Sequence, residues 1–113
     1  MAMAEISEDA KNLVEEFQTY QQQLQSLVMQ KETLKMQNVE IDRALEELDA
    51  SKEKQAYKIT GNVMISKPVE ELKKDLGETK EAIEVKIKSF EKMEEKFNSR
   101  LRELQAKLKD VMK

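Results

Sequence analysis

The sequence predicts a mainly α-helical fold, in which two long helices form an antiparallel coiled coil and a single β-hairpin joins them. Apolar residues recur at heptad spacing in both halves of the chain, and a strand-like stretch lies between the halves. Charged residues make up 38% of the 113 residues and aromatic residues only 4%, which does not suit a conventional globular core. This composition is typical of long solvated helices, and the regular apolar spacing argues against a disordered chain.

The first helix is predicted over residues 7–54. Ser7 can cap its first N–H groups, and no proline or glycine interrupts it. Two rows of residues, one lying four positions after the other, form the a/d seam of a coiled coil. The rows are Leu13, Tyr20, Leu27, Leu34, Ile41 and Leu48, and Phe17, Leu24, Lys31, Asn38 and Leu45. The polar members Lys31 and Asn38 either fix the register of the coiled coil or mark a solvated gap in its seam.

The second helix is predicted over residues 67–113, with Pro68 in its first turn, where a missing N–H is tolerated. Its heptad row comprises Leu76, Ile83, Phe90, Phe97, Leu104 and Val111. This row mirrors the first helix about Asn62, so that Tyr20 matches Leu104 and Leu27 matches Phe97. The symmetry predicts two antiparallel arms of equal length, with both chain ends at one tip. A first helix from about residue 8 to about residue 52 would be roughly 65 Å long.

Residues 56–66 are predicted to form the β-hairpin, because two β-prone runs flank Thr60-Gly61-Asn62. A two-residue turn at Gly61-Asn62 would place Ile59 opposite Met64. A three-residue loop would instead gather four apolar side chains on one face, and we favour that register. Two such short strands are not stable alone, and their free edges attract other strands, so the hairpin is expected to mediate assembly. The expected assembly residues are Tyr57, Ile59, Gly61, Val63, Met64 and Ile65.

Several classes of function are excluded by residues that the sequence lacks. Without histidine and cysteine, the commonest general base, nucleophile and zinc ligands are missing, and the glycines form no phosphate-binding loop. We therefore expect no enzyme, no cofactor and no metal site. The net charge of -3 does not indicate the basic surface that binds nucleic acid. No apolar run is long enough to span a membrane. The N-terminus has no basic and apolar regions of a signal peptide, so a cytoplasmic location is expected.

The expected tip of the coiled coil carries more apolar residues than one seam requires. These candidate binding residues are Val14, Phe17, Tyr20, Leu24, Leu101, Leu104, Leu108 and Met112. They either close the coiled coil or form apolar grooves for other chains. Flexible methionine side chains would suit varied partners.

The stretch from Ala56 to Ile65, with the motif Tyr57-Lys58-x-x-Gly61 before an apolar strand, resembles the β-type subunit of prefoldin, in an archaeal-like form. The glutamine-rich first helix and the Leu-Glu-Glu-Leu sequence of residues 45–48 add to this resemblance. The resemblance covers nearly the whole chain and implies one prefoldin-like domain over residues 1–113. It also implies a hexamer of two α-type and four β-type subunits, whose hairpins combine into an intersubunit β-barrel.

The same resemblance implies an ATP-independent chaperone. Such a complex captures non-native proteins at the tips of its coiled coils and delivers them to a group II chaperonin. The alternative is a structural coiled-coil protein that only oligomerises or tethers partners. The hairpin favours the chaperone, because a simple tether does not need a strand pair at its bend.

Overall fold

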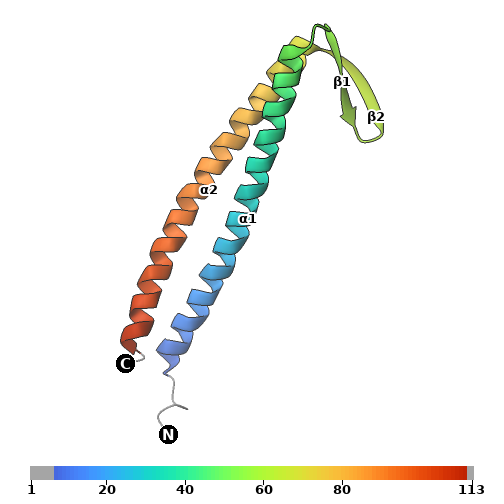
Figure 1. The fold of residues 1–113 in the computed structure, drawn as a ribbon. Coiled ribbons are helices and arrows are strands. Elements are labelled where there is room, and N and C mark those ends of the chain that lie inside the picture. Colours follow the sequence, from blue (N-terminus) through green and yellow to red (C-terminus); the bar gives the residue numbers. More distant parts are fainter. Residues whose placement is uncertain (1–6, 112–113) are drawn as a thin grey trace. The chain divides into compact units, whose positions relative to one another are not determined.

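The computed structural model describes residues 7–111 and contains two long helices connected by a two-stranded antiparallel hairpin (Figure 1). The elements follow the order α1 (Glu8–Ala50), β1 (Gln55–Thr60), β2 (Val63–Pro68) and α2 (Val69–Val111). They are divided between two compact units. The terminal unit combines residues up to 31 with residues from 89 onward, and the hairpin unit comprises residues 32–88. The expected fold class of two long helices and one hairpin is confirmed.

The start of α1 is capped as predicted. The Ala10 N–H donates to the Ser7 hydroxyl at 3.1 Å, and the Lys11 N–H donates to the Ser7 carbonyl at 3.0 Å. Glu8 and Asp9 occupy the first turn, where negative charge is favourable beside the positive end of the helix dipole. These contacts satisfy N–H groups that would otherwise have no partner within the helix.

The end of α1 and the start of α2, where the helices meet the hairpin, differ from the predicted positions. α1 stops at Ala50, four residues before the predicted end. The Ser51 hydroxyl accepts the N–H of Glu53 at 3.1 Å, and such a local bond competes with continued helix. Pro68 is the last residue of β2 and precedes α2, rather than lying in its first turn.

The predicted rows supply part of the apolar core of both units, to which Ala10, Val69 and Leu72 add buried residues from outside the rows. Every member of the two α1 rows is buried or half-buried. Val111, from the α2 row, is instead 46% exposed. The buried apolar residues among those described are Ala10, Leu27 and Leu104 in the terminal unit and Val69, Leu72 and Ile83 in the hairpin unit. In each unit the core is therefore an apolar stripe between α1 and α2, and the hairpin contributes no buried residue to it.

Ion pairs and one ring contact fix how α1 and α2 align within the terminal unit. Lys31 Nζ lies 2.6 Å from Glu94 Oε2, and the two side chains are only 12% and 25% exposed. The ring of Tyr20 meets Phe97 edge to face, with centroids 5.6 Å apart. The symmetry of the rows had predicted Leu104 opposite Tyr20, but the residue in contact with Tyr20 is Phe97, seven positions earlier. At this contact α2 is therefore displaced by one heptad from the symmetric alignment.

Two further ion pairs join α1 to α2 within the hairpin unit. Lys73 Nζ lies 2.8 Å from Asp49 Oδ1, and Lys80 pairs with Asp42. Hydrogen bonds to these carboxylates raise the pKa of both lysines. Asn38, the other polar residue of the seam, has its Oδ1 buried without a hydrogen-bond partner in the described chain. A buried oxygen without a hydrogen bond lowers the stability of the fold, so the packing between the helices is less favourable at Asn38 than at the apolar positions of the seam.

The hairpin register is the one that we did not favour. Ile59 pairs with Met64 and Thr60 pairs with Val63, so Gly61-Asn62 forms a two-residue turn. Gly61 has a φ of 60°, whereas no non-glycine residue of the described chain has a positive φ. A positive φ at the first central residue alone corresponds to a type II′ turn, whose twist matches that of the flanking strands. The predicted three-residue loop is therefore wrong.

The two glycines should respond oppositely to alanine. Gly61→Ala forces a side chain into the positive-φ region and should lower the free energy of unfolding by about 1–3 kcal/mol. Gly77 lies in α2, and a Cβ added there meets no atom within 4 Å. Gly77→Ala should raise the free energy of unfolding by about 0.5–1 kcal/mol. Urea unfolding at a fixed protein concentration measures both, and shifts in the same direction would contradict this explanation.

The Lys31–Glu94 pair should respond as a partly buried ion pair. Glu94→Gln removes the carboxylate that lies 2.6 Å from Lys31 Nζ and should lower the free energy of unfolding by about 1–3 kcal/mol. The exchanged variant, Lys31→Glu with Glu94→Lys, restores opposite charges and should recover most of the loss. Chemical unfolding of the two variants beside the parent chain tests this coupling. An exchanged variant no more stable than Glu94→Gln would show that the pairing contributes nothing.

Candidate functional site

The outer edges of the hairpin carry main-chain groups that its two strands do not pair. The Val69 N–H donates to the Lys54 carbonyl at 2.9 Å, which identifies this opposed pair as a hydrogen-bonded one. Opposed pairs in an antiparallel ladder alternate between hydrogen-bonded and non-hydrogen-bonded. With the observed register, the N–H groups of Tyr57, Ile59 and Met64 point away from the other strand. Pro68 occupies another outward position, so its missing N–H costs no bond between the strands.

Both faces of the hairpin expose apolar side chains. Opposed residues share a face, so Tyr57, Ile59 and Met64 lie on one face, whereas Val63 and Ile65 lie on the other. All five are between 42% and 71% exposed. The expectation of four apolar residues on one face is corrected by this register. Instead, each face has apolar surface to cover, and the face with Val63 and Ile65 also carries Lys58 and Lys67.

A largely apolar pocket of about 490 Å³ lies within the hairpin unit, between the helices and β1. The pocket is lined by the apolar residues Ala44, Leu48, Ala56, Leu72 and Leu76, together with Glu47, Tyr57, Lys58, Asp75 and Thr79. Sequence reasoning missed this pocket, because it combines residues from three elements. The small side chains at Ala44 and Ala56 are the only sequence signal that points to open space there.

The terminal unit holds the residues that were expected to bind other chains. Val14 is exposed, whereas five others are half-buried: Phe17, Tyr20, Leu24, Leu101 and Leu108. Leu104 is 0% exposed and belongs to the core, while Met112 lies outside the described residues. The exposed Val111 was assigned to the seam and missed as a surface residue. The accessible apolar surface is therefore smaller than the sequence alone suggested.

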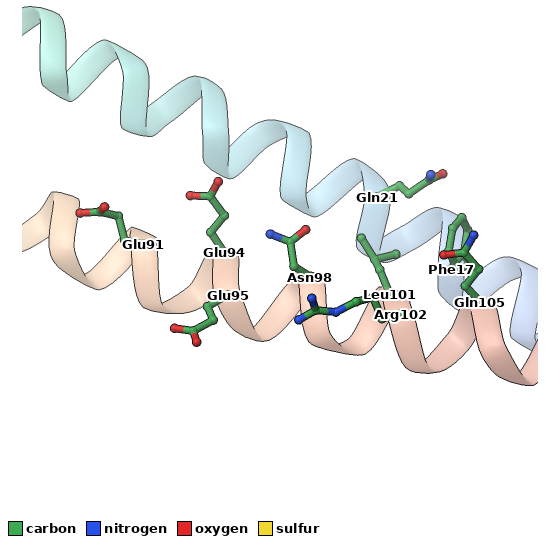
Figure 2. Close-up of a pocket in the computed structure, with 9 residues that line it drawn as sticks. All are labelled: Phe17, Gln21, Glu91, Glu94, Glu95, Asn98, Leu101, Arg102 and Gln105. Carbon is green, nitrogen blue, oxygen red and sulfur yellow. The ribbon is translucent and has the colours of Figure 1, made fainter.

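Two grooves expose part of these half-buried side chains. The larger, of about 790 Å³, has Phe17 and Leu101 among mostly polar walls, and Figure 2 shows Leu101 extending from α2 toward α1. Gln105 is one of the polar residues of this lining. The second groove, of about 560 Å³, places Leu24 and Leu101 among four glutamines of α1. Each groove thus offers a small apolar floor surrounded by amide or charged groups.

A charged cluster joins α1 to α2 within the terminal unit. Arg100 Nη2 lies 2.6 Å from Glu16 Oε1, and Arg100 Nη1 lies 2.7 Å from Glu103 Oε2. The hydrogen bonds to Glu16 and then Glu103 raise the pKa of Arg100. The hydrogen bond from Arg100 lowers the pKa of Glu103 below its ordinary value of 4.5. This hydrogen bond therefore contributes its full stability above about pH 4.5, the ordinary pKa of the carboxyl group, and the contribution is lost as the pH falls through the lowered pKa of Glu103.

The described residues offer little support for other kinds of site. No cluster of acidic side chains among residues 7–111 is arranged to hold a metal ion. Neither described helix is apolar enough over a sufficient length to cross a membrane. The candidate functional surfaces are the exposed hairpin and the grooves of the terminal unit.

Comparison with known proteins relates this arrangement to one family. The family model described as prefoldin subunit matches residues 11–113. The chain is 35% identical to the prefoldin subunit beta of Archaeoglobus fulgidus over 111 residues, which cover 97% of this chain and 96% of the relative. It is 28% identical to the prefoldin subunit beta of Thermococcus kodakarensis, with coverage of 98% and 96%.

A solved structure gives the same result. The crystal structure of the prefoldin beta subunit from Thermococcus strain KS-1 matches with a TM-score of 0.84, at 28% identity and over 95% of both chains. The match extends over the helices and the hairpin described above. The chain therefore belongs to the family of prefoldin subunits, which are non-enzymatic chaperone components, and is similar to its beta subunits.

Proposed function

We propose that this chain is a β-type subunit of a hexameric, ATP-independent holdase that captures non-native proteins and delivers them to a group II chaperonin in the cytoplasm. The observation that carries the proposal is the hairpin, which exposes apolar side chains on both faces and main-chain groups on both edges. A chain that served only as a helical tether would gain nothing from such an element. An assembly element combined with a separate binding unit suits a chaperone subunit.

Assembly explains the hairpin in physical terms. Two strands alone are at best marginally stable, and their open edges are a liability in a monomer. Closure of several hairpins into a barrel satisfies the outward N–H and C=O groups and covers the exposed apolar side chains. We propose that α-type subunits supply the remaining hairpins, in a complex of two α-type and four β-type chains.

Client capture suits the grooves of the terminal unit. An unfolded protein presents apolar side chains without fixed geometry, and the Phe17 and Leu101 groove offers apolar contact within polar walls. Each groove alone would bind weakly. Several subunits in one complex would bind the same client together, so that avidity raises the apparent affinity without stronger individual contacts. Neither nucleotide nor metal has a role in this scheme.

Removal of exposed apolar surface from the terminal unit should weaken client protection. The variant Val14→Ser with Val111→Ser changes two exposed valines of this unit. Its matched control, Val39→Ser with Val85→Ser, changes two exposed valines of the hairpin unit. Light scattering of a chemically unfolded model client, diluted into each complex, reports protection. We expect the first variant to need several-fold more complex for equal protection and the control to match the parent. Equal loss in both would contradict a binding role specific to the terminal unit.

Charge introduced on the hairpin should dissociate the complex. Ile59→Lys and Ile65→Lys place one charge on each face, and burial of either charge would cost several kcal/mol. Val85→Lys introduces the same charge at an exposed helical position and is the control. Sedimentation velocity should show smaller species for each hairpin variant and unchanged species for the control. Unchanged sedimentation of both hairpin variants would refute assembly through the hairpin.

A further inference from the structure

The pocket of the hairpin unit is open although apolar side chains of the same hairpin lie exposed. Val63 and Ile65 contribute nothing to its lining and remain 58% and 42% exposed. The lining contains four aliphatic residues from the helices, Ala44, Leu48, Leu72 and Leu76. Its volume of about 490 Å³ falls within the range of pockets that enclose whole ligands, so it can receive more than one aliphatic side chain. Solvated apolar lining of this kind gains stability when another apolar group covers it.

We infer that this pocket receives β2 of a second copy of the chain, with Val63 and Ile65 as the inserted side chains. The inference rests on the proposed assembly through the hairpin and specifies one of its contacts. The pocket is continuous with that assembly element, because Ala56, Tyr57 and Lys58 of β1 form part of its lining. A neighbouring chain that pairs with the hairpin is therefore brought to the opening of the pocket.

Charge complementarity favours the face with Val63 and Ile65 as the occupant. That face also carries Lys58 and Lys67, whereas the pocket lining has two carboxylates, of Glu47 and Asp75, and one ammonium group, of Lys58, and so keeps a net negative charge. Within one chain Lys67 lies 3.7 Å from Glu71 and 3.9 Å from Asp75, and Glu47 forms no ion pair among the described residues. The opposite face, with Tyr57, Ile59 and Met64, offers no positive charge. Opposite charges at the edge of a contact guide association and fix its orientation.

The inferred contact joins two different surfaces of the same chain. Each copy would supply its pocket to one neighbour and its β2 residues to another. A contact of this kind is heterologous. Where two β-type copies are neighbours in the proposed complex, it would combine pairing of their hairpins with support from the helices beneath them.

Disulfide trapping tests the contact directly, because the chain contains no cysteine. One full-length preparation carries Ala44→Cys in the pocket, and a second, with a different mass tag, carries Ile65→Cys. After mixing, exchange of subunits and mild oxidation, mass spectrometry measures the disulfide-linked pair between the two preparations. Ala82→Cys, at an exposed alanine of α2 outside the pocket, replaces Ala44→Cys in the control. We expect the pocket pair to form several-fold more linked product than the control pair.

Filling the pocket provides the second measurement. Ala44→Phe should occupy it from within and raise the dissociation constant of the complex several-fold, whereas Ala82→Phe should not. Circular dichroism checks that the helices of both variants persist. An assembled complex without preferential linkage at position 44 and unaffected by Ala44→Phe would overturn the pocket contact alone. A parent chain that remains monomeric at all concentrations, with and without an α-type partner, would overturn both this contact and the proposed assembly.

Discussion

The main-chain groups on the outer edges of β1 and β2 impose the constraint on which the rest of this structure depends. The ladder between the strands satisfies only every second residue of each strand, and the remaining N–H groups point outward. The described helices leave all five large apolar side chains of the hairpin exposed, on both of its faces. Such an element is marginal as part of a single chain, and a complex of several chains resolves both problems together.

The helices meet a different constraint, because two helices can bury only one apolar stripe between them. This stripe accounts for the buried residues in both units, and the polar contacts beside it determine how the helices align. Two ion pairs between the helices, Lys31 with Glu94 and Lys80 with Asp42, each stabilise one alignment of α1 against α2, because a shift along the helix axis would separate the charges. A defined alignment keeps Phe17 and Leu101 together at the larger groove of the terminal unit. The seam therefore builds the surface that we propose for client capture.

The sequence was sufficient to predict the elements that depend on local patterns. Heptad spacing identified both helices and nearly all of the seam, and the Ser7 cap follows from the chemistry of its hydroxyl. The hairpin register could not be predicted from apolar spacing, because it was decided by the backbone conformation of one residue, Gly61. Gly61 permits a type II′ turn, but the expectation that apolar side chains gather on one face favours the longer loop. That preference fails for this hairpin, which exposes apolar side chains on both of its faces.

The surfaces were harder to predict than the elements. Leu104 and Val111 belong to the same heptad row, yet one is fully buried and the other is exposed near the end of α2. Periodicity assigns a residue to a face of its helix but does not show where the opposing helix covers that face. The pocket beneath the hairpin likewise depends on how Ala44 of α1, Leu76 of α2 and Tyr57 of β1 come together. Contacts between residues distant in the sequence carry no local signal.

Hydrogen exchange at the outward N–H groups of the hairpin tests the central claim most directly. Mass spectrometry or nuclear magnetic resonance can follow the amides of Tyr57, Ile59, Met64 and Ser66 in the assembled complex and in chains dissociated by dilution. If neighbouring strands close the edges, these amides should exchange far more slowly in the complex than in the dissociated chains. Rapid exchange of all four amides within an intact complex would contradict the claim that assembly occurs through the hairpin.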